Sequence, residues 1–90
     1  MKHLKITVYG QVQNVGFRHY SCQKAKEFDV KGFIKNKPDG SVYIEAEGEK
    51  KDLDKFLDWC YSGPPWAEVG SIDYSFTNEF VGYDVFEIRY

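Results

Sequence analysis

Hydrophobic and polar residues alternate near both ends of the chain. The first run places apolar side chains at every second position, at Leu4, Ile6 and Val8. A period of two is typical of a strand with one buried face, so we predict a strand that ends at Gly10. Similar alternation predicts two further strands, around residues 69–76 and 83–90.

Two other segments carry apolar residues at helical spacing. The first runs from Arg18 to about Asp29 without Gly or Pro, and its apolar positions recur every three residues, at Cys22, Ala25 and Phe28. The second has them at i, i+3, i+4 and i+7, at Leu53, Phe56, Leu57 and Cys60. Each spacing gives a helix one apolar face. The second helix is expected to end at Ser62-Gly63-Pro64-Pro65, because Pro cannot continue a helix.

Two short strands joined by a turn lie between the predicted helices. Residues 32–36 and 42–46 flank Pro38-Asp39-Gly40, in which Pro fixes φ and Gly accepts a positive φ, so we predict a hairpin with Asp39 as a turn former. The element order is therefore β-α-β-β-α-β-β. This order belongs to the α+β class and predicts a ferredoxin-like split βαβ sandwich, an antiparallel sheet with both helices on one face. We expect residues 1–90 to form a single domain.

Composition favours a packed, soluble chain. Of the 90 residues, 42% are hydrophobic, 18% aromatic and 29% charged, which excludes a disordered protein. No unbroken apolar run exceeds three residues, whereas a membrane span needs about 20 and a signal-peptide core at least about seven. We therefore expect a cytoplasmic protein with no membrane partner, and a monomer by default.

Charge is nearly balanced over the chain but not between its halves. The net charge of −2 gives no field that would gather nucleic acid. Residues 1–45 hold eight Lys or Arg and four acids, whereas residues 46–90 hold four and ten. This asymmetry weakly favours an anion site in the first half, but a solvated surface of uneven sign explains it more simply.

The cysteines and histidines indicate neither a disulfide nor a metal site. Cys22 and Cys60 lack C-x-x-C spacing. We expect them on helices that run roughly parallel, too far apart to bridge, with Cys60 in the core. His3 and His19 have no partner at ligand spacing and are expected on the surface.

The segment with candidate chemistry joins the first strand to the first helix. Backbone N–H groups at a helix N-terminus lack intrahelical partners, and the helix dipole adds positive potential, so such a loop can hold an anion. Gly10, Gly16 and Asn14 can all adopt a positive φ. Arg18 adds a charged fork that matches two phosphate oxygens. From the residues alone, an ordinary turn followed by a surface Arg is at least as good an interpretation.

Read as a string, the segment resembles the acylphosphatase signature G-x-V-Q-G-V-G-F-R. It reads Gly10-Gln11-Val12-Gln13-Asn14-Val15-Gly16-Phe17-Arg18, and Asn14 is the one departure. A second family signature, G-[FYW]-[VI]-x-N-x-x-D-G-x-V, is intact from Gly32 to Val42 and contains Asn36. Residues 63–69 and 86–90 also look like family features, so the resemblance covers essentially the whole chain.

The resemblance implies an enzyme that hydrolyses acyl phosphates to a carboxylate and inorganic phosphate, without a metal or organic cofactor. Arg18 and Asn36 carry over as catalytic residues, Arg18 binding the phosphoryl group and Asn36 the attacking water. The implied phosphate-binding residues are those of the loop together with that arginine, namely Gly10, Gln11, Val12, Gln13, Asn14, Val15 and Arg18. Inorganic phosphate is expected as product and competitor.

Two other functions stay open. A non-catalytic relative could keep the fold and bind phosphate or a protein, with Asn14 as its mark. An RNA-binding module is the third reading, because Lys31-Gly32-Phe33 begins like its RNP1 motif, but the next residues do not continue it. At position 14, Asn suits a positive φ. Alternatively, its side chain could crowd the phosphate, or its carboxamide could hydrogen-bond across the loop and hold it closed, and either would lower affinity or turnover.

Overall fold

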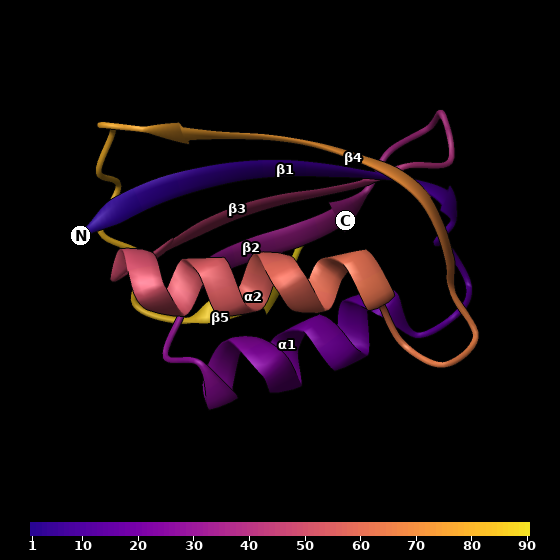
Figure 1. The fold of residues 1–90 in the computed structure, drawn as a ribbon, viewed down its shortest axis with the longest axis horizontal. Coiled ribbons are helices and arrows are strands. Elements are labelled where there is room, and N and C mark those ends of the chain that lie inside the picture. Colours follow the sequence, from indigo (N-terminus) through magenta and orange to yellow (C-terminus); the bar gives the residue numbers. More distant parts are fainter.

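Two helices lie side by side on one face of a five-stranded sheet (Figure 1). The computed structural model describes all of residues 1–90, with these elements: β1 (Lys2–Gln11), α1 (Phe17–Glu27), β2 (Lys31–Asn36), β3 (Val42–Gly48), α2 (Lys50–Ser62), β4 (Glu68–Thr77) and β5 (Phe86–Ile88). The predicted element order and ferredoxin-like fold are confirmed. The last strand is shorter than expected, three residues in place of residues 83–90.

The strand order is β4-β1-β3-β2-β5. All neighbours are antiparallel, as predicted, except β2 and β5, which pair in parallel and make the sheet mixed. The helices run antiparallel to each other, so the expectation of parallel helices was wrong (Figure 1). The reason is that α1 returns from β1 to β2, whereas α2 returns from β3 to β4, and β3 runs opposite to β1.

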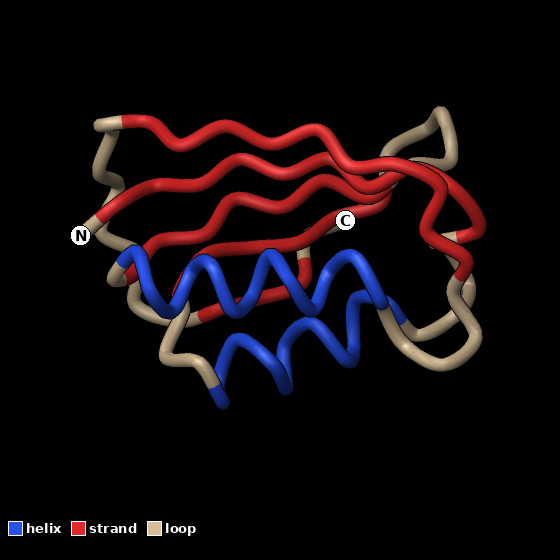
Figure 2. Tube along the Cα trace, viewed as in Figure 1, coloured by secondary structure: helices blue, strands red, loops and turns tan.

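The core lies between the helices and the sheet, the two layers that Figure 2 shows. Strand positions alternate, so one face of β1, β2 and β3 is apolar and fully covered. Its side chains are completely or almost completely buried, together with the apolar faces of the helices: Leu4, Ile6, Val8, Ile34, Val42, Ile44, Phe17, Leu53 and Phe56. This burial fixes the register of each strand, because a slip of one residue would turn the apolar face outward.

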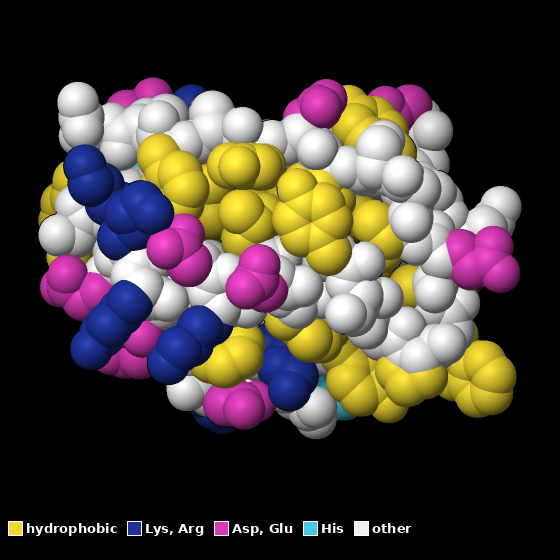
Figure 3. Space-filling view, in the orientation of Figure 1, with side chains coloured by type: hydrophobic (Ala, Val, Ile, Leu, Met, Phe, Trp, Pro, Cys, Tyr) yellow, Lys and Arg dark blue, Asp and Glu magenta, His cyan; other side chains and the backbone are white.

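The edge strand β4 is covered less completely. Ile72, Tyr74 and Phe76 pair with Val8, Ile6 and Leu4 and so face the helices, but Tyr74 is still 51% exposed. Figure 3 shows hydrophobic side chains along the margin between α2 and β4. No helix of the structure is both long enough and apolar enough to cross a bilayer.

Both cysteines are unpaired, as predicted. Cys60 is fully buried in the core, and burial raises the pKa of its thiol. Cys22 on α1 is only partly buried, and partial burial likewise raises its pKa, opposed by nearby Lys26.

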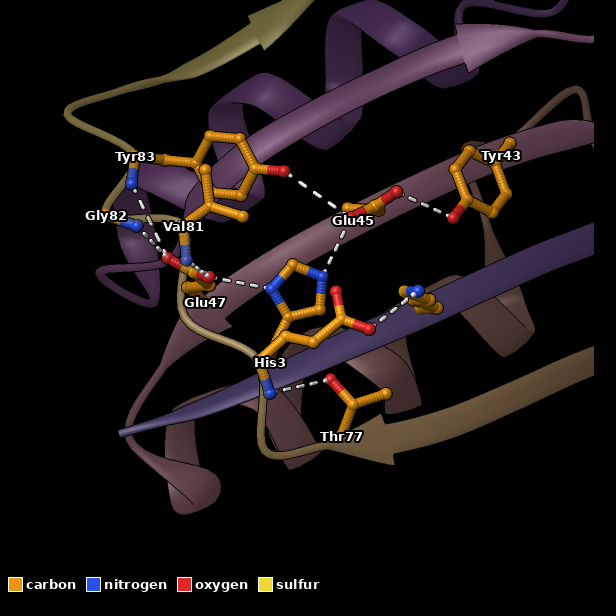
Figure 4. A network of polar contacts seen from close by, with 10 residues as sticks. His3, Tyr43, Glu45, Glu47, Thr77, Val81, Gly82 and Tyr83 are labelled. Carbon is orange, nitrogen blue, oxygen red and sulfur yellow. Dashed lines mark hydrogen bonds and ion pairs between the residues drawn. The ribbon is translucent and has the colours of Figure 1, made fainter.

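His3 is fully buried, so its predicted surface location was wrong. Its Nδ1 lies 2.7 Å from a Glu47 carboxylate oxygen and its Nε2 lies 2.8 Å from Glu45 (Figure 4). Both carboxylates stand on β3, paired across the sheet from the start of β1. The partners therefore lie more than 40 positions away in sequence, which is why spacing along the chain did not reveal them.

Glu47 also holds in place the segment between β4 and β5, here called the strap (residues 78–85). Its carboxylate accepts hydrogen bonds from the backbone N–H groups of Val81, Gly82 and Tyr83, at 2.6, 2.9 and 3.4 Å (Figure 4). The Tyr83 ring also lies 6.0 Å from that of Phe33, on the sheet face away from the helices. The strap thus connects β4, at one edge of the sheet, with β5, which pairs with β2 at the other edge.

Candidate functional site

Three positive-φ residues shape the end of β1 and the loop that follows it. The β1–β4 pairing shifts register between Tyr9 and Gly10, and Gly10 has φ +128°. A Cβ on Gly10 would collide with the Glu68 carbonyl oxygen, so only glycine fits there. Asn14 at φ 61° and Gly16 at φ 81° then turn the chain into α1. The positive φ anticipated at position 14 is present.

The loop of residues 12–16 keeps its backbone donors free. None of its five N–H groups donates a hydrogen bond within the protein. Gly16 is the N-cap of α1 and supplies no side-chain cap, and the first helical turn holds no acidic residue. Unpaired N–H groups beside a helix N-terminus provide partial positive charge and hydrogen-bond donors for an anion.

A cavity of about 180 Å³ opens beside this loop. It is lined by residues from the loop, α1, β2 and the end of the chain: Val12, Asn14, Gly16, Phe17, Arg18, His19, Asn36, Ile88 and Tyr90. The structure therefore brings Arg18 and Asn36, predicted from two separate motifs, to one cavity. Among the other predicted residues, Val12 and Asn14 line it, whereas Gly10, Gln11, Gln13 and Val15 do not.

Asn36 reaches the cavity through the alternation of β2. Ile34 faces the core opposite Ile44, so Asn36, two residues on, points to the same face at the end of the strand. There the sheet extends beyond the core and meets the start of α1, which carries Arg18. Ile34 and Asn36 belong to one row of side chains on β2. Ile34 lies in the hydrophobic core, and Asn36 lies just beyond it, where the cavity begins.

The same alternation, here along β5 on the other side of β2, places Tyr90 at the cavity. Ile88 pairs in parallel with Ile34, which places Tyr90 next to Asn36. The Arg18 guanidinium carbon lies 5.1 Å from the centre of the Tyr90 ring, close enough for a cation–π contact. Sequence reasoning left Tyr90 out of the site, although the alternation of Phe86, Ile88 and Tyr90 was visible.

Gln13 joins the loop to the β2–β3 hairpin. Its side-chain amide donates hydrogen bonds to the carbonyl oxygens of Lys37 and Ser41, at 2.8 and 2.9 Å. The predicted role of Gln13 involved only its backbone N–H group. The role of its side chain was not predicted, because a hydrogen bond to the backbone of a distant turn leaves no pattern in the sequence. In that turn, Asp39 accepts hydrogen bonds from the Ser41 N–H and hydroxyl, which lower its pKa and support its predicted role as a turn former.

The Asn14 carboxamide makes no hydrogen bond with the protein. The alternative in which it bonds across the loop and holds it closed is therefore wrong. Its side chain instead lines the cavity and is exposed. Asn14 leaves the backbone donors of the loop available.

The site combines a guanidinium and free N–H groups with two carboxamides, those of Asn14 and Asn36, and no acidic side chain lines the cavity. Such a set favours a compact anion with several oxygens. Fold and site together define a small α+β protein of ferredoxin-like topology, with a loop of free backbone donors between its first strand and first helix.

Comparison with known proteins identifies the family. The acylphosphatase family model matches residues 4–88. The chain is 47% identical over 87 residues to the acylphosphatase of Archaeoglobus fulgidus, with 97% of both chains covered. It is 46% identical over 90 residues to that of Thermotoga maritima, covering 100% of this chain and 99% of the relative. The crystal structure of acylphosphatase from Bacillus subtilis matches with a TM-score of 0.97, at 34% identity and full coverage of both chains.

The chain belongs to the acylphosphatase family and is an enzyme. Family and fold support the hydrolysis of acyl phosphates.

Proposed function

We propose that the cavity beside loop 12–16 is the active site, and that it cleaves the carboxyl–phosphate bond of acyl phosphates without a metal. The observation that carries this proposal is the meeting of Arg18 and Asn36 in one cavity beside five free backbone donors. In this mechanism Arg18 and the loop N–H groups bind the phosphoryl oxygens. Asn36 holds the water that attacks phosphorus.

The division of roles follows from the chemistry of the substrate. A carboxylate is already a good leaving group, so the enzyme needs little acid catalysis and chiefly stabilises charge on the phosphoryl oxygens and aligns water. A guanidinium supplies two parallel donors to those oxygens. The carboxamide of Asn36 both accepts from and donates to water and adds no negative charge beside an anionic substrate.

Metal independence is consistent with the side chains at the site. The cavity is lined by one imidazole, that of His19, and by no Asp, Glu or Cys side chain. Nowhere does the chain gather three His, Cys, Asp or Glu residues able to hold a metal ion. The charge that a metal would supply is instead provided by Arg18 and the N-terminus of α1.

The test is a spectrophotometric assay with an aromatic acyl phosphate, run with and without chelator. We expect hydrolysis well above the spontaneous rate, unchanged by the chelator and competitively inhibited by inorganic phosphate. Phosphate binding without hydrolysis would instead establish the non-catalytic alternative. Loss of activity with chelator, restored by a divalent cation, would contradict the metal-free mechanism.

We extend the proposal to a monomer acting in the cytoplasm. One chain supplies every residue of the cavity, so the site needs no second copy. The two unpaired cysteines suit a reducing compartment. Size-exclusion chromatography with light scattering at micromolar concentration checks the monomer.

A further inference from the structure

The phosphate-binding loop and the asparagine of the proposed site stand on strands that are not neighbours. Loop 12–16 follows β1, Asn36 ends β2, and β3 lies between them. The β1–β3 ladder pairs residues as far as Val8 with Val42. Beyond that pair no backbone ladder links the loop to the hairpin, so their separation depends on side chains.

The Gln13 side chain supplies that link. Its Nε2 carries two hydrogens and donates to two carbonyl oxygens of the hairpin, Lys37 at 2.8 Å and Ser41 at 2.9 Å. These are the hydrogen bonds that connect the loop with the turn of residues 37–41. The hydrogen bond to Ser41 is partly buried, which limits competition from water there, whereas the hydrogen bond to Lys37 is exposed.

The two acceptors lie at the neck of the hairpin, directly after Asn36. Ser41 O also accepts the Lys37 N–H at 2.9 Å, and Lys37 O accepts the Gly40 N–H at 3.1 Å. The turn is therefore closed on itself, and the Gln13 amide holds it as a unit. A shift of this unit would move Asn36 relative to the loop.

We propose that Gln13 is a positioning residue that sets the distance between the water held by Asn36 and the phosphoryl group held by the loop. This inference rests on the proposed function of the cavity. Gln13 acts through Asn36 and does not itself touch the reacting atoms. Its loss affects turnover more than phosphate binding, because Arg18 and the loop N–H groups stay in place.

Gln13→Met tests the proposal, because Met has a similar shape but no donor. We expect kcat to fall about 10- to 100-fold, the cost typical of a displacement near 1 Å at a reacting group. The inhibition constant for inorganic phosphate should stay within about twofold. Asn78→Met is the control, since the Asn78 amide is exposed in the strap and lies outside the cavity, and we expect it to leave kcat unchanged.

A double-mutant cycle with Asn36→Ala separates positioning from general stability. If Gln13 acts through Asn36, Gln13→Met should cost much less in the Asn36→Ala background than in the wild type. Full additivity of the two effects would overturn the proposal. A parallel loss of kcat and phosphate affinity would also overturn it, because that result means that Gln13 supports the loop itself.

A second readout does not need activity. Phosphate added to the wild type should shift the amide NMR signals of Lys37 and Gly40 through the Gln13 link, and Gln13→Met should abolish those shifts while the signals of the loop still move. Unchanged coupling in the variant would overturn the proposal. An inactive wild type with normal coupling would instead refute the proposed function and leave the link established.

Discussion

At both ends of the sheet, backbone N–H groups lie outside the strand ladders, but at only one end does the chain itself supply an anion to accept their hydrogen bonds. At the strap, three successive N–H groups surround the Glu47 carboxylate. At the other end of β1, about 26 Å away by strand rise, the N–H groups of loop 12–16 have no acceptor in the protein. Both segments contain a glycine at φ 81°, Gly82 and Gly16.

The comparison indicates what separates a group of backbone donors that stabilises the fold from one that is free to bind a ligand. Glu47 is covalently attached and 3% exposed, so its donors are permanently satisfied and hold the strap in place. The loop lies beside a cavity that the Arg18 guanidinium also lines. Hydrogen bonds to a carboxylate of the chain itself contribute to folding stability. Backbone N–H groups that have no such acceptor stay free to bind an anion from solution. Changes at the first site should therefore affect unfolding, and changes at the second should affect kinetics.

The largest expected effect is that of Arg18→Ala. Removing the guanidinium takes away a permanent positive charge that lines the cavity, so we expect kcat/KM to fall by about 10³ or more, with weaker phosphate inhibition. The melting temperature should change little, because the cation–π partner of Arg18 is the exposed Tyr90 ring, whose contact adds little to stability. Steady-state kinetics and thermal melts check both expectations.

Arg18→Lys is the informative control. It keeps the charge but loses the fork, so little activity should return. Near-normal kinetics for this variant would mean that charge alone suffices and that bidentate binding is not used.

Asn36→Ala ranks second and should separate turnover from binding. Loss of one positioned group at a reacting centre typically costs about 10² to 10³ in rate. We expect that loss in kcat, with the phosphate inhibition constant nearly unchanged. Asn78→Ala, at an exposed position in the strap, serves as control. A folded Asn36→Ala variant with full activity would remove Asn36 from the mechanism.

Glu47→Gln should affect stability and leave turnover within about twofold. Burial raises the pKa of Glu47, but hydrogen bonds from Val81, His3, Gly82 and Tyr83 outweigh burial and hold the pKa below its ordinary value. A carboxyl with a lowered pKa in the folded state stabilises the protein above its unfolded pKa of about 4.3. We therefore expect the variant to lose about 1–3 kcal/mol of unfolding free energy at pH 7.

The sign of the pH dependence follows. As pH falls through the folded-state pKa of Glu47, the wild type loses this contribution, so the difference between wild type and Glu47→Gln should shrink in acid. Urea unfolding at several pH values measures it. Glu27→Gln, which breaks only an exposed ion pair with Lys24, should cost less than about 0.5 kcal/mol. Equal losses for the two variants would contradict a special role for the buried carboxylate.

The sequence was sufficient for the fold because local patterns carry it. Alternation at Leu4, Ile6 and Val8 and helical spacing in α2 are both properties of neighbouring residues. His3 and Gln13 show the limit: their partners lie 44, 42, 28 and 24 positions away and are set by strand register. Arg18 and Asn36 were found only because each belongs to a recognisable motif, whereas Tyr90 depends on the parallel pairing of β5.

The smallest effect is expected from Asn14→Gly, at the residue that breaks the family signature. Asn14 already has φ 61°, so Gly relieves backbone strain while it increases the entropy of the unfolded chain, and these changes oppose each other. We expect the unfolding free energy to change by less than about 1 kcal/mol. Removing the carboxamide widens the cavity at its rim, so kcat/KM or phosphate affinity should rise by a few-fold.

Asp29→Gly is the matched control, because Asp29 is exposed at φ 57° outside the cavity. It should reproduce the stability change without the kinetic one. If both variants leave kinetics and phosphate binding unaltered, Asn14 is a neutral occupant of a positive-φ position, and the 12–16 loop differs from the strap in its acceptor alone.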